Sequence, residues 1–193
     1  MFSHLRPAAV MLAAMTLLTG LAYPLAITRI AGAVAPEAAA GSLMTRDGVI
    51  VGSSLIGQGF AGEGYLHPRP SASGWNAAAS GASNLGPTTA ALIAAVVERR
   101  AGYEAENGVA APVDAITTSA SGLDPDISPE NAAGQAARIA VARGVAPAEV
   151  TRLIAGLTQG RWIGLYGLPR VNVLQANLAL DAAFPLTPTS PEN

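Results

Sequence analysis

The sequence predicts an α+β protein with one N-terminal transmembrane helix followed by a single small extracytoplasmic domain. Three observations support this fold class. Residues 7–28 form an uncharged apolar run, an Asp-Gly pair separates two apolar stretches near residue 48, and helix-forming patterns with capping residues recur after residue 87. The first is typical of a membrane span, and the other two are typical of a small domain that combines a hairpin with helices.

The uncharged run contains 22 residues and lies between Arg6 and Arg29. A helix needs ~20 residues to cross a hydrocarbon core of ~30 Å, so we expect residues 7–28 to span the bilayer. Pro24 is expected to kink the last turn of this helix. The alternative is a cleaved signal peptide, because small residues at 31–33 fit a cleavage site, although the apolar run is long for such a segment.

The ends of the span divide the rest of the chain. Residues 1–6 are expected to form a cytoplasmic stub, residues 29–184 the extracytoplasmic α+β domain, and residues 185–193 a disordered, proline-rich tail. A short stub followed by one span places the domain outside. The single arginine on each side of the span does not decide the orientation.

A β-hairpin is predicted within residues 42–60, where the Asp-Gly pair provides the turn and apolar residues flank it. Residues 61–87 then show no periodicity and are rich in Gly, Ser, Asn and Pro. Long loops in compact domains are commonly functional. Because Tyr65 and Trp75 are embedded in this one, we expect an ordered loop that can bind a partner.

Helical patterns follow the loop. The expected helices cover residues 87–103, 129–144, 147–160 and 172–183. Ser128 is expected to cap the second helix, with Pro129 at its first position. In the last helix, Leu174, Leu178 and Asp181 share one stripe.

Apolar spacing indicates which faces of two of these helices point inward. In the first, the residues on the apolar side are Leu92, Ile93, Val96 and Val97, and those expected to project away are Glu98, Arg99 and Arg100. In the third, the spacing i, i+3, i+4, i+7 is occupied by Val150, Leu153, Ile154 and Leu157.

The composition excludes several functions. A net charge of −2 with 12% charged residues provides no basic field for nucleic acid. There is no cysteine, and all 11 basic residues are arginine, which excludes thiol chemistry, a Walker-type phosphate loop and a Schiff base. His67 is the one histidine beyond residue 7, so no multi-histidine metal site is expected. Residues 164–167, Gly-Leu-Tyr-Gly, are similar to a channel filter, but a filter needs neighbouring membrane helices.

Two loop segments contain residues of the kinds that bind a cation or catalyse hydrolysis. Asp124 and Asp126 lie in a tight polar loop that includes several serines, and this could hold a cation; turn and cap hydrogen bonds are the favoured interpretation. His67 precedes Ser71 and Ser73, as in a hydrolase site, but no nucleophile-elbow sequence is present. We therefore expect neither a metal site nor a catalytic residue.

Two sets of polar residues remain as candidates for contact with a partner. Arg69 lies between prolines, where its guanidinium can bind a carboxylate either of a partner or of this chain. Asn131, Gln135 and Arg138 form a polar stripe on the helix after Ser128. This stripe is either a hydrogen-bonding face for a partner or nucleotide, or an ordinary solvated face, which the residues alone favour.

A series of motifs resembles one family in order and spacing. These are LRPA at 5–8, LIGQGF at 55–60, HPRPSA at 67–72, SGASNLGP at 80–87, TTSASGLDPDISPENA at 117–132 and RVNVLQANLALD at 170–181. Together they are similar to the C subunit of the Kdp-type, high-affinity potassium-transporting P-type ATPase of bacteria, over residues 3–183. Two small departures are SGASN, where a double-glycine form is common, and Asp126, at a variable position.

The resemblance implies an accessory subunit of the bacterial inner membrane, needed for assembly and activity of a potassium uptake complex. Its implied partners are a potassium-conducting A subunit, an ATP-hydrolysing B subunit and a small F subunit, together with lipid around the helix. The family is described as a catalytic chaperone that raises the ATP affinity of the B subunit through a transient complex with ATP. No tightly bound cofactor is implied.

The polar stripe and the polar residues of the loops and last helix provide the candidate site residues. The expected nucleotide or partner contacts are Asn131, Gln135 and Arg138, and the expected partner interface residues are Arg69, Ser71, Asn84, Ser121, Asp124, Asn172 and Asn177. The alternative from residue chemistry alone is a membrane-tethered envelope hydrolase or ligand-binding domain built around His67.

Overall fold

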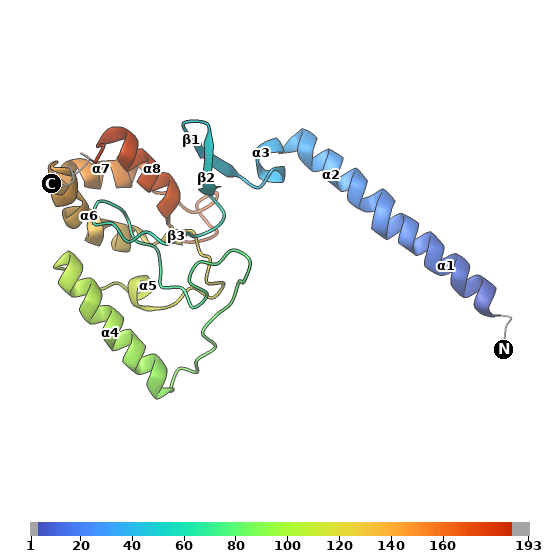
Figure 1. Cartoon of the computed structure of the whole chain (residues 1–193), viewed down its shortest axis with the longest axis horizontal. Coiled ribbons are helices and arrows are strands. Elements are labelled where there is room, and N and C mark those ends of the chain that lie inside the picture. Colours follow the sequence, from blue (N-terminus) through green and yellow to red (C-terminus); the bar gives the residue numbers. More distant parts are fainter. Residues whose placement is uncertain (1–3, 187–193) are drawn as a thin grey trace, which may run out of the picture. The chain divides into compact units, whose positions relative to one another are not determined.

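The computed structural model describes residues 4–186 (Figure 1). The chain divides between Leu43 and Met44 into two compact units. The first is dominated by one long apolar helix, and the second, called the body below, mixes helices with two small sheets. This mixed composition confirms the α+β prediction for the body. Apart from residues 185 and 186, the predicted tail at 185–193 lies outside the described residues, as do residues 1–3 of the predicted stub.

The first unit forms a helix from Leu5 to Val34 that is built from three segments. These are α1 (Leu5–Leu17), the π-helical turn η2 (Leu18–Ala22) and α2 (Tyr23–Val34). Its most apolar window has a mean hydropathy of 1.9 and none of that window is buried, so by length and composition it is a candidate membrane span. A short helix, α3 (Pro36–Ala39), follows.

The helix is longer than the predicted span at 7–28. Pro24 lies in the first turn of α2, and the helix continues to Val34, so the prediction that Pro24 falls in the last turn is wrong. Proline cannot donate to the carbonyl four residues earlier, and the π-helical turn directly before it is where the regular pattern is interrupted. The small residues at 31–33 lie in the last turns of α2.

The predicted hairpin is present, but it is shorter than residues 42–60. Strands β1 (Leu43–Arg46) and β2 (Val49–Ser53) form a two-stranded sheet. Asp47 and Gly48 both have positive φ angles, 52° and 78°, as an Asp-Gly hairpin turn requires. After β2 the chain leaves the sheet, and the Gly57 amide donates to Leu123 O at 2.8 Å. A Cβ at Gly57 would collide with the backbone oxygen of Asp124, so only glycine fits this crossing.

Helix α4 (Ala90–Asn107) begins and ends later than predicted. A turn precedes it, in which Thr89 N donates to Gly86 O at 3.0 Å, and Gly108 ends it with a φ of 68°. Its orientation also differs from the prediction, because Ile93 and Val97 are exposed by 55% and 61%. Arg99 does not project away, since its side chain reaches Ile116 O, at 3.3 Å, in the short helix α5 (Val113–Ile116).

The core lies around helices α6 (Pro129–Arg143), α7 (Pro147–Leu157) and α8 (Val173–Ala183). Figure 1 shows these three helices gathered on one side of the body, with α4 along another flank. The residues fully excluded from solvent include Leu66, Ala132, Ile139, Ala140, Val150, Val171, Ala176 and Leu180. The predicted stripe of α7 is confirmed, because Val150 and Ile154 are buried and Leu153 and Leu157 pack against them. On α8, Leu174, Leu178 and Asp181 line one cavity, as a shared stripe requires.

A second sheet, which the sequence did not predict, joins β3 (Asp126–Ile127) to β4 (Val171–Asn172). The strands are antiparallel, and Asp126 pairs with Asn172 while Ile127 pairs with Val171. Each strand directly precedes or lies near the start of a core helix, so this short ladder aligns the beginnings of α6 and α8.

Candidate functional site

Two amide side chains from different helices hold the backbone of Leu66 and His67. Asn177 on α8 accepts a hydrogen bond from Leu66 N at 2.7 Å and donates one to Leu66 O at 3.0 Å. Gln135 on α6 does the same for the next residue, accepting from His67 N at 2.7 Å and donating to His67 O at 3.1 Å. Both amides are 2% exposed. Because they satisfy buried backbone groups as a neighbouring strand would, they fix the long loop against the core.

Arg138 holds the preceding part of the same loop. Its guanidinium donates to Glu63 O, to Tyr65 O at 3.1 Å and to Gln135 Oε1 at 2.8 Å. Its Nε donates to Asn107 Oδ1 at 3.1 Å. Burial lowers the pKa of Arg138, although the side chain remains a cation. Each of its three nitrogens already donates, so Arg138 could bind an external phosphate only by breaking these contacts.

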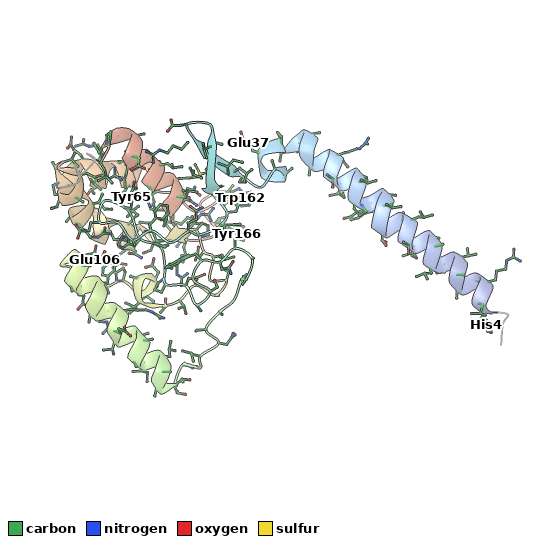
Figure 2. All side chains as sticks on the ribbon, viewed as in Figure 1. His4, Glu37, Tyr65, Glu106, Trp162 and Tyr166 are labelled. Atoms are coloured by element: carbon green, nitrogen blue, oxygen red, sulfur yellow. The ribbon has the colours of Figure 1, made fainter. Side chains whose placement is uncertain are left out.

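Arg143 at the end of α6 provides a third attachment. Its guanidinium donates to three backbone carbonyls, those of Gly64 (2.7 Å), Leu180 (3.1 Å) and Phe184 (2.6 Å). It also forms an ion pair with Asp181 at 2.9 Å and lies 5.0 Å from the centre of the Tyr65 ring. Tyr65, which belongs to the long loop, is labelled in Figure 2. The Arg143 side chain is completely buried, so it joins the loop, α6 and the end of α8 inside the body.

The start of α6 is held by Asp114 of α5. The Asp114 carboxylate accepts hydrogen bonds from Ser128 N at 2.8 Å, Ser128 Oγ at 2.9 Å and Asn131 Nδ2 at 3.1 Å. Ser128 Oγ in turn accepts from Asn131 N at 3.0 Å, which confirms the predicted cap. Asn131 is 1% exposed and Gln135 2%, so the interpretation of their stripe as an ordinary solvated face is wrong.

Arg69 forms an internal salt bridge, with 2.9 Å between its Nη1 and Asp124 Oδ2. Asp124 Oδ1 also accepts from Asp126 N at 3.1 Å, as turn chemistry predicts. Asp114, Asp126 and Arg170 join this pair around an open cavity of about 340 Å³. Both acidic and basic side chains line this cavity. It therefore matches the polar surface of a partner protein better than a phosphate group, which the acidic side chains would repel.

Two predicted interface serines lie where loops cross. Ser71 Oγ donates to Gly122 O at 2.7 Å, and Ser121 Oγ accepts from Leu123 N at 3.0 Å. Gly122 has a φ of 70°, and a Cβ there would collide with Ser73 and the Gly81 carbonyl. Ser71 is half-buried and Ser121 exposed. These serines therefore stabilise the crossing of the two loops through their hydrogen bonds, and of the two only Ser121 is exposed to solvent.

Of the remaining predicted residues, Asn172 is a cap and Asn84 is a surface residue. Asn172 accepts from Gln175 N at 3.0 Å at the start of α8 and donates to Ser54 O at 2.8 Å. Asn84 is exposed and has a φ of 52°, a conformation that asparagine tolerates. The predicted site residues thus lie on loops, at helix starts and, for Gln135, Arg138 and Asn177, within α6 and α8, and most make hydrogen bonds inside this chain.

His67 lines a smaller cavity of about 160 Å³ with Tyr103 and Glu106. Its Nδ1 lies 3.1 Å from Glu106 Oε1, and its Nε2 lies 3.1 Å from Gly62 O. Figure 2 labels Glu106 near the end of α4. Burial, followed by the charge of Arg138, lowers the pKa of His67, and burial raises the pKa of Tyr103 to about 12. Neutral forms of both rings are therefore favoured here.

The hydrolase arrangement around His67 is not formed. Both ring nitrogens contact groups other than a serine, and Ser71 Oγ bonds Gly122 O and Ser73 Oγ instead. Nucleophilic catalysis needs the base within hydrogen-bond reach of the nucleophile. Within residues 4–186, no group of three or more His, Cys, Asp or Glu side chains that could hold a metal ion is found.

The lowered pKa of His67 leads to a prediction about stability at acidic pH. The pKa of His67 in the folded state lies below 6.5, so the unfolded chain takes up this proton first as the pH falls. The free energy of unfolding therefore decreases as the pH falls from above 6.5 towards the lower pKa of the folded state. Burial raises the pKa of Asp126 above 3.8, which acts in the opposite sense at lower pH. We expect His67→Gln to weaken the loss of unfolding free energy between about pH 8 and about pH 5.5, measured by urea unfolding. His4→Gln, at an exposed position, is the control, and equal slopes in both variants would contradict the assignment.

Sequence reasoning missed Asp114, Tyr65 and Arg143 as organising residues. Arg143 follows Ile139 by four positions on the apolar stripe of α6, and an arginine in that register is the signal that could have revealed it. Asp181 was placed on the correct stripe, but its ion pair with Arg143 joins residues 38 positions apart. For Asp114, no local pattern indicates its contacts with Ser128.

Comparison with known proteins identifies a family. A family model described as "KdpC: K+-transporting ATPase, c chain" matches residues 5–182. A potassium-transporting ATPase KdpC subunit of Cereibacter sphaeroides is 64% identical over 183 residues, which cover 95% of this chain and 99% of that protein. The KdpC subunits of Methylorubrum extorquens and Caulobacter vibrioides are each 55% identical, covering 93% and 96% of this chain and 97% and 96% of their own lengths.

Proposed function

Because this chain belongs to the KdpC family of K+-transporting ATPase c chains, we propose that it is a non-catalytic accessory subunit of a high-affinity, ATP-driven potassium uptake complex. In this role it is needed for assembly and activity of the complex. The match over residues 5–182, which includes both the long helix and nearly all of the body, carries this proposal.

The proposed partners are a potassium-conducting A subunit, an ATP-hydrolysing B subunit and a small F subunit in the bacterial inner membrane. The helix at Leu5–Val34 serves as a retained anchor that docks among their membrane helices. Its small residues Ala13, Ala14, Gly20 and Ala22 permit close helix packing. The absence of lysine and cysteine supports a role outside the chemical step.

We further propose that this subunit raises the ATP affinity of the B subunit without binding ATP itself. The supporting observation is that Gln135 and Arg138 already hydrogen-bond to the backbone of Glu63, Tyr65 and His67 in this chain. A subunit can change another subunit's ligand affinity by binding its two conformations unequally. Coupling through contact also agrees with a body outside the cytoplasm, where ATP is not present.

Cysteine labelling tests this topology, since the natural chain has no cysteine. Ala120 is exposed in the loop after α5, so Ala120→Cys is accessible to a thiol reagent. In sealed membrane vesicles, we expect a membrane-impermeant maleimide to modify it only from the extracytoplasmic side. His4→Cys, before the helix, is the matched control and should react only from the cytoplasmic side.

Labelling of Ala120→Cys from the cytoplasmic side alone would overturn the proposed topology. The body would then share a compartment with ATP, and direct nucleotide contact through Gln135 and Arg138 would become the better account. The family assignment would survive that result, because it depends on sequence similarity over residues 5–182.

A further inference from the structure

One loop of the body carries an exposed apolar surface that has no part in the proposed coupling. We call residues 161–170 the apolar loop. Its large exposed side chains are Trp162 (70%), Ile163 (66%), Leu165 (74%), Tyr166 (66%) and Leu168 (74%). Five such side chains lie within seven residues, and exposed apolar groups concentrated in this way mark an interaction surface.

The backbone of the apolar loop is closed on itself. At its base, Gln159 and Arg170 exchange two backbone hydrogen bonds of 2.8 and 3.0 Å. Further out, Trp162 N donates to Tyr166 O at 2.9 Å, and Tyr166 N donates to Trp162 O at 3.1 Å. Leu165 N also bonds Trp162 O at 3.1 Å. These hydrogen bonds fix the shape of the loop, so the apolar side chains between Trp162 and Tyr166 are presented on an ordered turn.

The side chains change in character from the base to the tip. Arg161 and Arg170 lie at the base, and Arg170 is partly neutralised by Asp126 at 3.1 Å. The rings of Trp162 and Tyr166 come next, with their centroids 6.2 Å apart (Figure 2). Ile163 and Leu165 lie between them in sequence, at the turn. Cation, aromatic and aliphatic groups follow in the same order from the headgroups of a bilayer towards its hydrocarbon.

We propose that the apolar loop inserts into the interfacial region of the bilayer that holds the chain's own helix. Trp162 and Tyr166 then lie at headgroup level, and Arg161 binds lipid phosphate. Residues 159–170 contain no acidic side chain, and the nearby Asp126 carboxylate is paired with Arg170. The helix ends at Val34 and the body begins at Met44, so only residues 35–43 connect the two.

Lipid quenching of single-tryptophan chains tests this insertion, because the sequence has only two tryptophans. Trp75→Phe leaves Trp162, and Trp162→Phe leaves Trp75, which packs against Gly59 in the body. Each full-length variant is reconstituted into phosphatidylcholine and phosphatidylglycerol vesicles with or without brominated acyl chains. We expect brominated lipid to quench the Trp162 emission strongly, as for an interfacial ring, and the Trp75 emission little.

Equal quenching of Trp162 and Trp75 would overturn the proposal. A second probe, a fluorophore on Leu165→Cys, separates lipid from protein as the occupant. Quenching by brominated lipid with this chain alone supports insertion. Shielding that appears only when the partner subunits are added, without lipid quenching, would assign the loop to a protein contact and overturn the proposal. The inference uses the proposed anchoring, but Ala120→Cys labelling tests that anchoring separately.

Discussion

Replacing Arg143 by methionine is expected to lower the free energy of unfolding by about 3–5 kcal/mol, the range for losing one partner of a buried ionic network. Methionine fills much of the same space, but it leaves the carbonyls of Gly64 and Phe184 without the Arg143 donor, while Leu180 O keeps only the Phe184 amide. It also removes the ion pair to Asp181 and the contact with the Tyr65 ring. Urea unfolding of the full chain in detergent, followed by tryptophan fluorescence, measures the change.

Arg46→Met is the matched control, because Arg46 pairs with the same Asp181 carboxylate at 2.6 Å. Its side chain is 53% exposed, whereas that of Arg143 is fully buried. Exposed ion pairs contribute about 0–1 kcal/mol, so this variant should lose no more than that. Similar losses in the two variants would show that the Arg143 contacts do not hold the loop to the core.

Asn177→Ala is expected to lower the free energy of unfolding by about 2–6 kcal/mol, since it leaves two buried groups of Leu66 unpaired at roughly 1–3 kcal/mol each. Leu66 itself is 0% exposed, so water cannot replace the amide without opening the body. The same variant should reduce the amount of subunit that co-purifies with the potassium-transport complex, because the loop from residue 61 would lose a fixed position.

Gln175→Ala provides the control for this variant. Gln175 is an amide on the same helix, but it is half-exposed, so a change within about 0.5 kcal/mol is expected there. A loss at Asn177 no larger than that at Gln175 would contradict the role assigned to the buried amide.

Local chemistry made several parts of the fold predictable. Ser128 followed by a proline identified the start of α6, and the apolar spacing of α7 identified its buried face. The Asp-Gly pair located the hairpin turn. Each of these features is determined by residues within one or two turns of chain, where spacing is a direct physical signal.

Contacts between distant segments were not predictable in this way. The β3–β4 ladder joins pairs such as Asp126 and Asn172, 46 positions apart, through strands of two residues each. Periodicity showed that Asn131 and Gln135 share a face, but it could not show that an irregular loop, full of backbone donors and acceptors, packs on that face. A polar stripe that satisfies such a loop has the same pattern as one that faces solvent.

We propose that this chain acts in potassium transport by contact with the ATP-hydrolysing subunit rather than by chemistry of its own. The most direct measurement is potassium-stimulated ATP hydrolysis across a range of ATP concentrations, by the complex purified with and without this chain. Without it, we expect activity to be lost or to require about 5–150-fold more ATP, the range of common coupling energies. An unchanged dependence on ATP in the complex that lacks this chain would contradict the account.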